Sequence, residues 1–306
     1  MFKGKIVLIT GGTGSLGTAL TKRLLKTDVE TIRIFSRDEW KQTQMHSSLN
    51  DGRLRYLIGD VRDKERLSRA LQDVDIVVHT AALKHVPVAE YNPFEAVKTN
   101  VQGAQNVLDC AIENEVNIAL GVGTDKAVSP LNTYGATKLL MERLFISKDY
   151  SSNNHKIKTM CVRYGNVLGS RGSVVPIFIN QILNNKRLTV TDPSMTRFNI
   201  TMNQALDLIF RSLSHGISGS VLIPKLKSYR LGDLKDAILQ LYDKKDQFDN
   251  IPLRSGEKSH EVLINNYELR NTFDMKEDYL LFDKENEYLD QSDWEKNSHY
   301  KNYDIC

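Results

Sequence analysis

Cysteine is scarce in this sequence: Cys110, Cys161 and Cys306 are the only three among 306 residues. Three cysteines cannot all be paired, and none of them has the short spacing of a zinc-ligand pair. The seven histidines do not cluster, and they show neither a zinc spacing nor a Ser-His-Asp order. These shortages exclude a disulfide framework and argue against a metal site or a hydrolase triad. We expect a reducing, cytoplasmic setting and no metal.

Long apolar runs are also missing. The run Ile6-Val7-Leu8-Ile9 leads directly into glycines and is far shorter than the roughly 18 apolar residues that cross a bilayer. The mean hydropathy of -0.38 agrees with this. We expect a first β-strand at this run, no membrane span, and no room before it for a transmembrane half. The pattern leaves peripheral membrane contact open.

Neither sign of charge dominates. Lys plus Arg number 41 against 38 for Asp plus Glu, a net charge of +3. This balance argues against a nucleic-acid partner, which needs a basic footprint, although it leaves a local basic patch open. A hydrophobic content of 41% in 306 residues suffices for one large α/β domain, or for a domain with a smaller lobe.

Short β-branched runs alternate with longer amphipathic segments up to about residue 150, which is typical of repeated βα units and a parallel sheet. Strands are predicted at residues 5–10, 31–35, 54–58, 75–80, 118–122 and 159–164. Helices are predicted to begin near Ser15, Asp38, Asp63, Pro93 and Thr133, several of them at residues suited to capping. The sequence therefore predicts a Rossmann-like, doubly wound α/β sheet in residues 1–165.

The second part of the chain has a looser pattern. Helices are expected at residues 174–184, 202–215 and 231–242, with brief strands at 188–190 and 220–223. We assign residues 166–275 mainly to a smaller C-terminal lobe that folds back in part on the first domain. Residues 276–306 form an acidic tail of unknown role, and eight acids in residues 277–295 favour a solvated, helical or irregular segment.

The first predicted strand is followed by a glycine-rich segment, residues 10–17, with glycines at positions 11, 14 and 17. Glycine permits a positive φ at the turn, a close approach of a pyrophosphate to the backbone, and close packing of helix on sheet. The N-terminus of the following helix then faces the anion. A strand before the glycines and a helix after them indicate a dinucleotide site. The alternative is a tight turn without a ligand.

The end of the second strand indicates which dinucleotide binds. An NAD site places an acid there, whereas this chain has Ser36 and Arg37, a hydroxyl and a guanidinium suited to a 2′-phosphate. NADP is therefore favoured. Asp38 either pairs with Arg37 or caps the next helix. Asp60 and Val61 follow the third strand, where Asp60 either contacts the adenine or serves a turn or a helix cap.

Tyr134 and Lys138 lie four residues apart on a predicted helix and so share one face. The lysine ammonium and an oxidised nicotinamide would lower the pKa of the tyrosine, making a phenolate that takes a hydroxyl proton. Thr124, at the end of the fifth strand, lies before this pair in the chain. The alternative is a surface Tyr and Lys on an amphipathic helix.

The glycine loop, the Tyr/Lys pair and Thr124 together resemble the extended short-chain dehydrogenase/reductase superfamily over residues 3 to 265. Within it, six further motifs are similar to the soluble UDP-N-acetylglucosamine 4,6-dehydratases of the C5-inverting type, which begin pseudaminic acid synthesis. These motifs are Ser36-Arg37-Asp38-Glu39, Ala81-Ala82-Leu83-Lys84-His85-Val86-Pro87, Thr124-Asp125-Lys126, Arg163-Tyr164-Gly165-Asn166-Val167, Ser170-Arg171-Gly172-Ser173-Val174 and Met195-Thr196-Arg197-Phe198.

The resemblance implies oxidation of the sugar at C4, elimination of water across C5 and C6, and return of the hydride to C6. By that resemblance Lys126 abstracts the C5 proton and Asp125 assists protonation of the leaving 6-hydroxyl. A lysine base needs a lowered pKa, for which Lys84 is the candidate neighbour. Both side chains face the sugar only if the strand has ended by Thr124. Gly123 replaces a serine common in such enzymes, a change expected to loosen the segment. The alternative is an exposed loop pair.

The predicted sites follow from the motifs and the resemblance together. The catalytic residues are Thr124, Asp125, Lys126, Tyr134 and Lys138. The NADP site comprises Gly11, Thr13, Gly14, Ser15, Leu16, Gly17, Ser36, Arg37, Asp38, Lys41, Asp60, Val61, Thr80, Ala81, Ala82, Lys84, Asn100, Tyr134 and Lys138. The UDP-sugar site comprises Lys84, Asn166, Ser173, Val174, Arg197, Arg254 and Glu257. Each charged residue of the smaller lobe, taken alone, is also explained as a surface charge, and His85 as a structural histidine.

Three other functions stay open beside the inverting dehydratase: a retaining dehydratase, a UDP-sugar epimerase and a non-catalytic NADP-binding sensor. The presence of Tyr134 and Lys138 argues against the sensor. The superfamily resemblance also implies a homo-oligomer, with the helices around residues 94–114 and 133–149 as dimer faces. Apolar stripes on these helices would look the same if they were merely buried.

Overall fold

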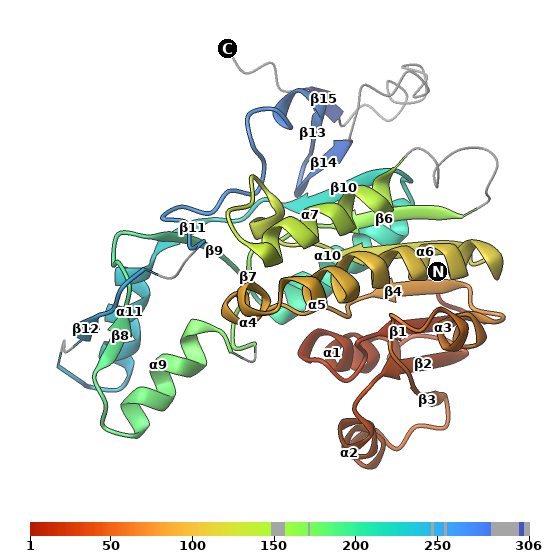
Figure 1. Cartoon of the computed structure of the whole chain (residues 1–306), viewed down its shortest axis with the longest axis horizontal. Coiled ribbons are helices and arrows are strands. Elements are labelled where there is room, and N and C mark those ends of the chain that lie inside the picture. The colour runs from red at the N-terminus through yellow and green to blue at the C-terminus, as the bar shows by residue number, and fades with distance from the viewer. Residues whose placement is uncertain (148–156, 171, 246–247, 254–255, 283–299, 303–306) are drawn as a thin grey trace.

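The computed structural model describes residues 1–147, 157–170, 172–245, 248–253, 256–282 and 300–302 (Figure 1). Its centre is a sheet of ten strands in the order β15-β13-β14-β10-β6-β5-β4-β1-β2-β3. The strands from β3 to β10 are parallel, and β14, β13 and β15 extend the sheet antiparallel. Their bounds are β1 Ile6–Thr10, β2 Thr31–Ser36, β3 Leu54–Ile58, β4 Ile76–His79, β5 Ile118–Val122, β6 Lys158–Val162, β10 Ser220–Pro224, β13 Thr272–Met275, β14 Asp278–Phe282 and β15 Tyr300–Asn302.

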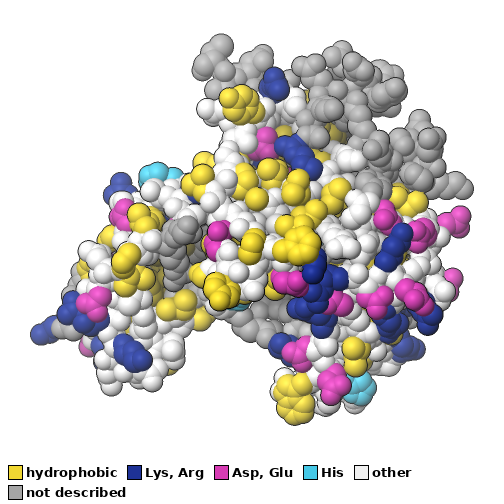
Figure 2. All heavy atoms as spheres, in the orientation of Figure 1, with side chains coloured by type: hydrophobic (Ala, Val, Ile, Leu, Met, Phe, Trp, Pro, Cys, Tyr) yellow, Lys and Arg dark blue, Asp and Glu magenta, His cyan; other side chains and the backbone are white. Residues whose placement is uncertain are grey.

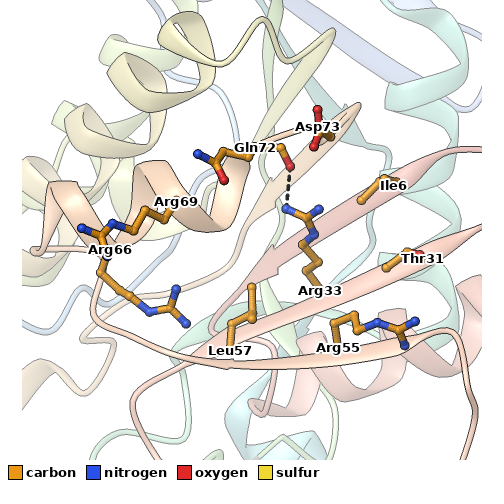
Figure 3. A pocket seen from close by; sticks show the side chains of 9 residues that line it. All are labelled: Ile6, Thr31, Arg33, Arg55, Leu57, Arg66, Arg69, Gln72 and Asp73. Atoms are coloured by element: carbon orange, nitrogen blue, oxygen red, sulfur yellow. Dashed lines mark hydrogen bonds between the residues drawn. The ribbon is translucent and has the colours of Figure 1, made fainter.

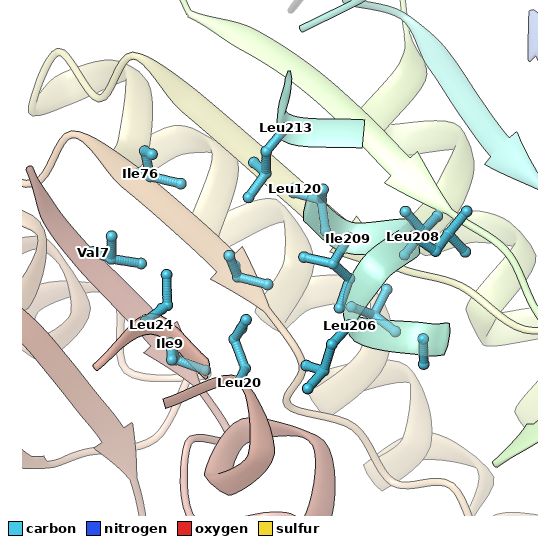
Figure 4. Packing of buried hydrophobic residues seen from close by; sticks show 14 of the residues in the cluster. Val7, Ile9, Leu20, Leu24, Ile76, Leu120, Leu206, Leu208, Ile209 and Leu213 are labelled. Carbon is cyan, nitrogen blue, oxygen red and sulfur yellow. The ribbon is translucent and has the colours of Figure 1, made fainter. Parts of the chain in front are cut away.

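Helices cover both faces of the sheet. The helices α1 (Ser15–Leu24), α2 (Glu39–Leu49) and α10 (Met202–His215) pack on one face, where Val7 and Ile9 meet Leu20 and Ile209 (Figure 4). The helices α3 (Lys64–Leu71), α6 (Gly103–Glu113) and α7 (Thr133–Ile146) pack on the other face, around Leu8. A strand buried on both faces explains the continuous apolar run at residues 6–9.

The predicted doubly wound sheet is confirmed, with each of the six predicted strands present within two residues of its expected ends. Asp38 and Asp63 cap α2 and α3 by accepting from the backbone N–H groups of Lys41 and Arg66. The helix expected near residues 93–114 differs: it is divided into α5 (Pro93–Val97), a π-helical turn η1 (Lys98–Gln102) and α6, and α4 (Val86–Tyr91) precedes it. The bounds of the predicted domains stay a prediction.

A smaller lobe lies at one end of the main sheet (Figure 1). It contains α9 (Val174–Leu183), β8 (Leu188–Val190), α11 (Leu231–Leu241) and β12 (Phe248–Asn250), with its own core around Phe178 and Ile238. A three-stranded sheet of β7 (Asn166–Val167), β9 (Thr196–Ile200) and β11 (Ser228–Arg230) adjoins it. The 3₁₀ turns η2 (Asp125–Ala127) and η3 (Leu269–Asn271) complete the described elements. Between these segments the chain returns through α10 and β10 to the main sheet.

The expectation of a solvated segment over residues 277–295 is wrong for its first part. Residues 278–282 form β14, which lies between β10 and β13, and Leu280, Leu281 and Phe282 are buried. The buried Asp278 is held by the Arg211 guanidinium, whose Nε donates to Oδ2 at 2.6 Å. Burial of the apolar run outweighs the local density of acids. Residues 283–299 lie outside the described part.

In the described part of the chain, every helix is too short or too polar to cross a membrane.

Candidate functional site

A cavity of about 790 Å³ runs along the carboxyl ends of the strands and reaches into the smaller lobe. The carboxyl edge is where ligands bind in open α/β sheets. Most residues predicted for the cofactor and the substrate line this cavity. They are Gly11, Thr13, Gly14, Ser15, Leu16, Gly17, Ser36, Arg37, Asp38, Lys41, Asp60, Val61, Thr80, Ala81, Ala82, Lys84, Thr124, Lys126, Tyr134, Lys138, Asn166, Ser173, Val174, Arg197 and Glu257.

The glycine loop has the geometry of a dinucleotide site. Gly11 has a φ of +65°, and a Cβ there would lie 2.8 Å from the Cα of Ala81. A Cβ on Gly17 would lie 2.6 Å from the Cα of Gly12, so the helix can approach the turn only without a side chain. Gly14 precedes α1, whose first turn is capped by no described side chain. Gly14, Ser15, Leu16 and Gly17 line the cavity, so the N-terminus of α1 lies beside it and fits a pyrophosphate.

The residues after β2 are organised around Ser36. Its buried hydroxyl accepts from Thr13 Oγ1 at 3.2 Å and from Gln42 Nε2 at 3.0 Å. Arg37 is more than half exposed and lies 3.6 Å from Asp60. Asp38 caps α2 and pairs with Lys41, which decides between the two roles considered for it. Arg37 therefore lines the cavity at the end of β2 with only a loose ion pair to Asp60.

Two predicted cofactor residues have structural contacts of their own. Asp60 receives bonds from the backbone and the side chain of Arg62, the turn role that the sequence left open, and it also lines the cavity. Asn100 does not line it: its amide bonds to both backbone groups of Leu83 and to Thr137 Oγ1. Asn100 therefore fixes the wall of the cavity from behind.

The strand β5 ends before Thr124, as the sequence analysis required if Asp125 and Lys126 are both to face the sugar. The strand ends at Val122, and Thr124 caps η2 by accepting from the backbone N–H of Lys126. Lys126 lines the cavity, whereas Asp125 is fully buried beneath it. Asp125 Oδ1 accepts from Thr124 Oγ1 at 3.0 Å and from Lys126 Nζ at 3.1 Å. Asp125 thus reaches the cavity through two neighbours.

The expectation that Gly123 loosens this segment is wrong. Its N–H donates to Val162 O at 2.6 Å. A Cβ at this position would lie 2.8 Å from that same oxygen and 3.0 Å from the carboxylate of Glu142. Glycine lets β5 and β6 approach closely here, and a serine would force them apart.

Tyr134 and Lys138 are both buried on α7 and line the cavity together. Burial raises the pKa of Tyr134, and the Lys126 ammonium and a hydrogen bond with Thr124 oppose the rise. Burial lowers the pKa of Lys138 to about 8. The cation that acts on the tyrosine in this structure is therefore Lys126, whereas the sequence pointed to Lys138.

Lys84 was expected to lower the pKa of Lys126, but the groups that act on Lys126 are hydrogen-bond acceptors and acids. Burial favours the neutral amine, but Asp125, Glu261 and Tyr134 outweigh this effect and raise the pKa of Lys126. The expected lowering by Lys84 is not found. Glu261, whose Oε1 lies 3.8 Å from Lys126 Nζ, was missed by the sequence analysis, because it is separated from Lys126 by more than a hundred residues and belongs to no motif.

The smaller lobe supplies the other end of the cavity. Asn166 Oδ1 accepts from Lys126 Nζ at 3.2 Å, and Arg197 lies 3.3 Å from Glu257. Ser173 precedes the first turn of α9, where its hydroxyl donates to Ser170 O at 2.7 Å. Arg254 lies outside the described residues. Tyr229, which the sequence did not suggest, lines the cavity from β11 and donates to Asn199 Oδ1 at 3.1 Å.

A second cavity of about 410 Å³ lies apart from this site, between α3 and the strands β1 to β3 (Figure 3). Four arginines line it, and the guanidinium groups of two of them, Arg33 and Arg66, bond to backbone carbonyls of the fold. Arg33 donates to Ala70 O and Gln72 O at the end of α3, and Arg66 donates to Ile58 O. The bonds of Arg33 satisfy carbonyl groups that the end of α3 leaves open, and the bond of Arg66 ties α3 to the end of β3.

Comparisons with known proteins agree with this site. The family model described as "Polysaccharide biosynthesis protein" matches residues 7–282. The chain is 45% identical to a UDP-N-acetylglucosamine 4,6-dehydratase (inverting) of Campylobacter jejuni, over 94% of this chain and 87% of that protein. It is 44% identical to a protein named UDP-glucose 4-epimerase from Rickettsia conorii, over 92% of this chain and 84% of that one.

Solved structures have the same fold. The crystal structure of Pen from Bacillus thuringiensis is 40% identical, with a TM-score of 0.88 over 92% of this chain and 90% of that chain. DesIV, a dTDP-glucose 4,6-dehydratase from Streptomyces venezuelae solved with NAD bound, has a TM-score of 0.77 at 21% identity, over 86% of this chain and 89% of that chain. At that identity the likeness concerns the fold alone.

Proposed function

The chain belongs to the polysaccharide biosynthesis protein family, and from this premise we propose that it is an NADP-dependent UDP-N-acetylglucosamine 4,6-dehydratase that inverts C5. One observation carries the proposal: Thr124, Lys126 and Tyr134 converge on a cavity that continues into a dinucleotide site. The 45% identity to a relative named for this reaction supports it. The product is UDP-2-acetamido-2,6-dideoxy-β-L-arabino-hex-4-ulose.

The cofactor site fits a dinucleotide, because the close approach at Gly11 and the first turn of α1 leave room and donors for a pyrophosphate. Arg37, paired only loosely with Asp60, supports NADP over NAD. When bound, NADP would accept a hydride from C4 of the sugar and later return it to C6. NAD, the cofactor in the DesIV structure, is the alternative.

The side chains of the cavity divide the proton transfers. Tyr134 takes the proton of the 4-hydroxyl, and Lys138, one turn later on α7, binds the ribose at the nicotinamide end of the cofactor. Lys126 takes the C5 proton, which the C4 ketone makes acidic; because its neighbours raise the pKa of Lys126, only the fraction present as the neutral amine reacts, and the rate should rise with pH. Asp125 assists protonation of the leaving 6-hydroxyl by positioning the Thr124 hydroxyl, which donates to Asp125 Oδ1 at 3.0 Å and lines the cavity.

The smaller lobe binds the UDP part. Arg197 and Arg254 provide cations for the diphosphate, and Asn166, Ser173, Val174 and Glu257 surround the sugar with Lys84 from the first domain. This assignment gives residues 1–165 the cofactor and the catalytic pair, and most of residues 166–275 the nucleotide sugar. The cytoplasmic location stays a prediction.

We also propose a homo-oligomer. Figure 2 shows apolar side chains gathered over α4, α5 and α7. Val88, Tyr91, Phe94 and Leu140 are at least half exposed there. A patch of this kind marks a protein contact. Analytical ultracentrifugation of the protein and of Tyr91→Glu tests it: an unchanged mass would contradict this face.

The decisive experiment is incubation with UDP-N-acetylglucosamine in heavy water. We expect a product lighter by one water, with one deuterium at C5 and the inverted configuration in its ring couplings. A retained configuration would indicate the retaining dehydratase.

The relatives named UDP-glucose 4-epimerase make an epimerase the second candidate. An epimerase would leave the mass unchanged, and a non-catalytic sensor would bind NADP without turnover. Turnover that survives both Tyr134→Phe and Lys126→Ala would contradict the assigned roles. We expect Lys126→Ala to block water loss while NADP binding, followed by fluorescence titration, persists.

A further inference from the structure

Glu261 is a buried carboxylate in the wall of the cavity, and it belongs to no helix or strand. Its position is nevertheless fixed by β9. Thr196 N donates to Ser259 O at 3.0 Å, and Glu261 N donates to Thr196 O at 3.4 Å. The segment 259–261 therefore runs beside β9 and carries the carboxylate to a defined place.

Glu261 lies between two ammonium groups. Its Oε1 is 3.8 Å from Lys126 Nζ, and its Oε2 is 3.6 Å from Lys258 Nζ. Both separations exceed hydrogen-bond distance, and Oε2 has no hydrogen-bond partner within the described part of the chain. Buried carboxylate oxygens are usually bonded. An oxygen left without a donor beside a ligand cavity indicates that its role is electrostatic.

Lys126 itself is held from three separate segments. Nζ donates to Asp125 Oδ1 at 3.1 Å and to Asn166 Oδ1 at 3.2 Å, while Glu261 approaches without taking an N–H bond. A neutral amine has two N–H bonds and one lone pair. With both N–H bonds directed to Asp125 and Asn166, the remaining position on Nζ holds a proton in the ammonium and the lone pair in the amine.

We propose that Glu261 is a positioning residue for proton transfer at Lys126, stabilising the ammonium by charge while Asp125 and Asn166 take its hydrogen bonds. This inference rests on the proposed function, in which Lys126 removes the C5 proton. In that step the C5–H bond breaks, an N–H bond forms on Nζ, and the electron pair moves into the enolate of the 4-ketone. Glu261 stabilises the ammonium that results.

The charges around Lys126 decide the expected pH dependence. Asp125 and Glu261 favour the ammonium and raise the pKa of Lys126, as does Tyr134 from α7. Lys258 lies 3.6 Å from Glu261, and we expect its charge to offset part of the effect of Glu261 on Lys126; Tyr229 approaches Lys126 from β11. Removing Glu261 therefore lowers the pH at which the amine becomes neutral, and removing Lys258 raises it.

The test is the rate of deuterium incorporation at C5 of UDP-N-acetylglucosamine in heavy water, measured against pH. In the wild type this rate should rise with pH as Lys126 loses its proton; we call this rise the acid limb. For Glu261→Gln we expect the midpoint of the acid limb to shift by about one pH unit or more toward lower pH. The maximal rate at high pH should be lower, because the amine is then a weaker base. Glu261→Asp keeps the charge and should keep the limb near that of the wild type. Lys258→Met should move the limb up. Asp249→Asn removes an exposed carboxylate elsewhere in the lobe and should change nothing.

An acid limb that stays in place in Glu261→Gln, in a protein whose melting temperature is unchanged, would overturn the inference. If that variant fails to fold, Lys258→Met decides alone: a downward or absent shift overturns the inference. A wild-type protein that neither exchanges the C5 hydrogen nor loses water refutes the proposed function instead, and the role of Glu261 falls with it.

Discussion

His79 ends β4 in the interior and predicts how this protein responds to acid. It is fully buried, its Nδ1 lies 2.9 Å from Thr10 Oγ1, and its ring stacks on Phe145 with centroids 5.9 Å apart. Nε2 has no partner in the described part of the chain. Burial, aided by the Lys138 ammonium, lowers the pKa of His79 to about 3. The folded protein therefore holds this ring neutral.

The size of the effect follows from linkage. An unfolded chain binds a proton at His79 below pH about 6.5, whereas the folded chain does not until the pH falls to about 3. The stability from the neutral ring is complete above the unfolded pKa and is lost as the pH falls through this window. Two units below the unfolded pKa, at about pH 4.5, the loss is about 2 to 3 kcal/mol.

Urea unfolding at a series of pH values from about 7 to about 4.5 measures this loss. His79→Gln keeps a side chain able to bond Thr10 but cannot titrate. We expect the variant to be less stable than the wild type at neutral pH, with a difference that shrinks by about 2 kcal/mol toward pH 4.5. His46→Gln, at an exposed histidine, is the control. Parallel stability curves for wild type and His79→Gln would refute the reasoning.

Three further predictions concern the glycine loop, the ion pairs and the cofactor. Gly17→Ala places a Cβ 2.6 Å from the Gly12 Cα, so NADP binding by fluorescence titration should be lost, and the melting temperature should fall; wild-type affinity would contradict the packing argument. Arg163→Met leaves two buried carboxylates, Glu142 and Glu268, without their cation, and should cost about 3 to 5 kcal/mol in denaturant unfolding; a near-neutral result would show that the pairs are dispensable. Arg37→Ala should weaken NADP binding roughly tenfold or more and leave NAD binding nearly unchanged; an equal effect on both would remove the 2′-phosphate assignment.

The first domain could be predicted from sequence because its signals are local. Gly11, Gly14 and Gly17 are close in the chain, and strand and helix periods frame them. The pair Tyr134 and Lys138 is set by one helical turn. These features depend on neighbours within a few residues, so one sequence is enough to place them.

The features that were missed depend on contacts between distant segments. The strand β14 was not predicted, because the acids of residues 277–295 suggested a solvated segment. Only the pairing of β14 with β10 shows that Leu280 and Phe282 are buried in the core. The role of Glu261 could not be predicted, because it depends on the pairing of residues 259–261 with β9, which brings Glu261 close to Lys126. Asn100 was assigned to the cofactor, but its amide is used by Leu83, a residue 17 positions away. No local period encodes such contacts.

One backbone contact joins the two proton-transfer groups. Gly135, in the first turn of α7, lies so close to η2 that a Cβ there would overlap the carbonyl oxygen of Lys126. Tyr134 precedes this glycine, so the backbone segments that carry the phenol and the amine lie side by side. Burial raises the pKa of Tyr134 and the Lys126 ammonium opposes that rise, while the tyrosine helps to raise the pKa of Lys126. Under the proposed function, a change of charge at either group therefore shifts the proton affinity of the other.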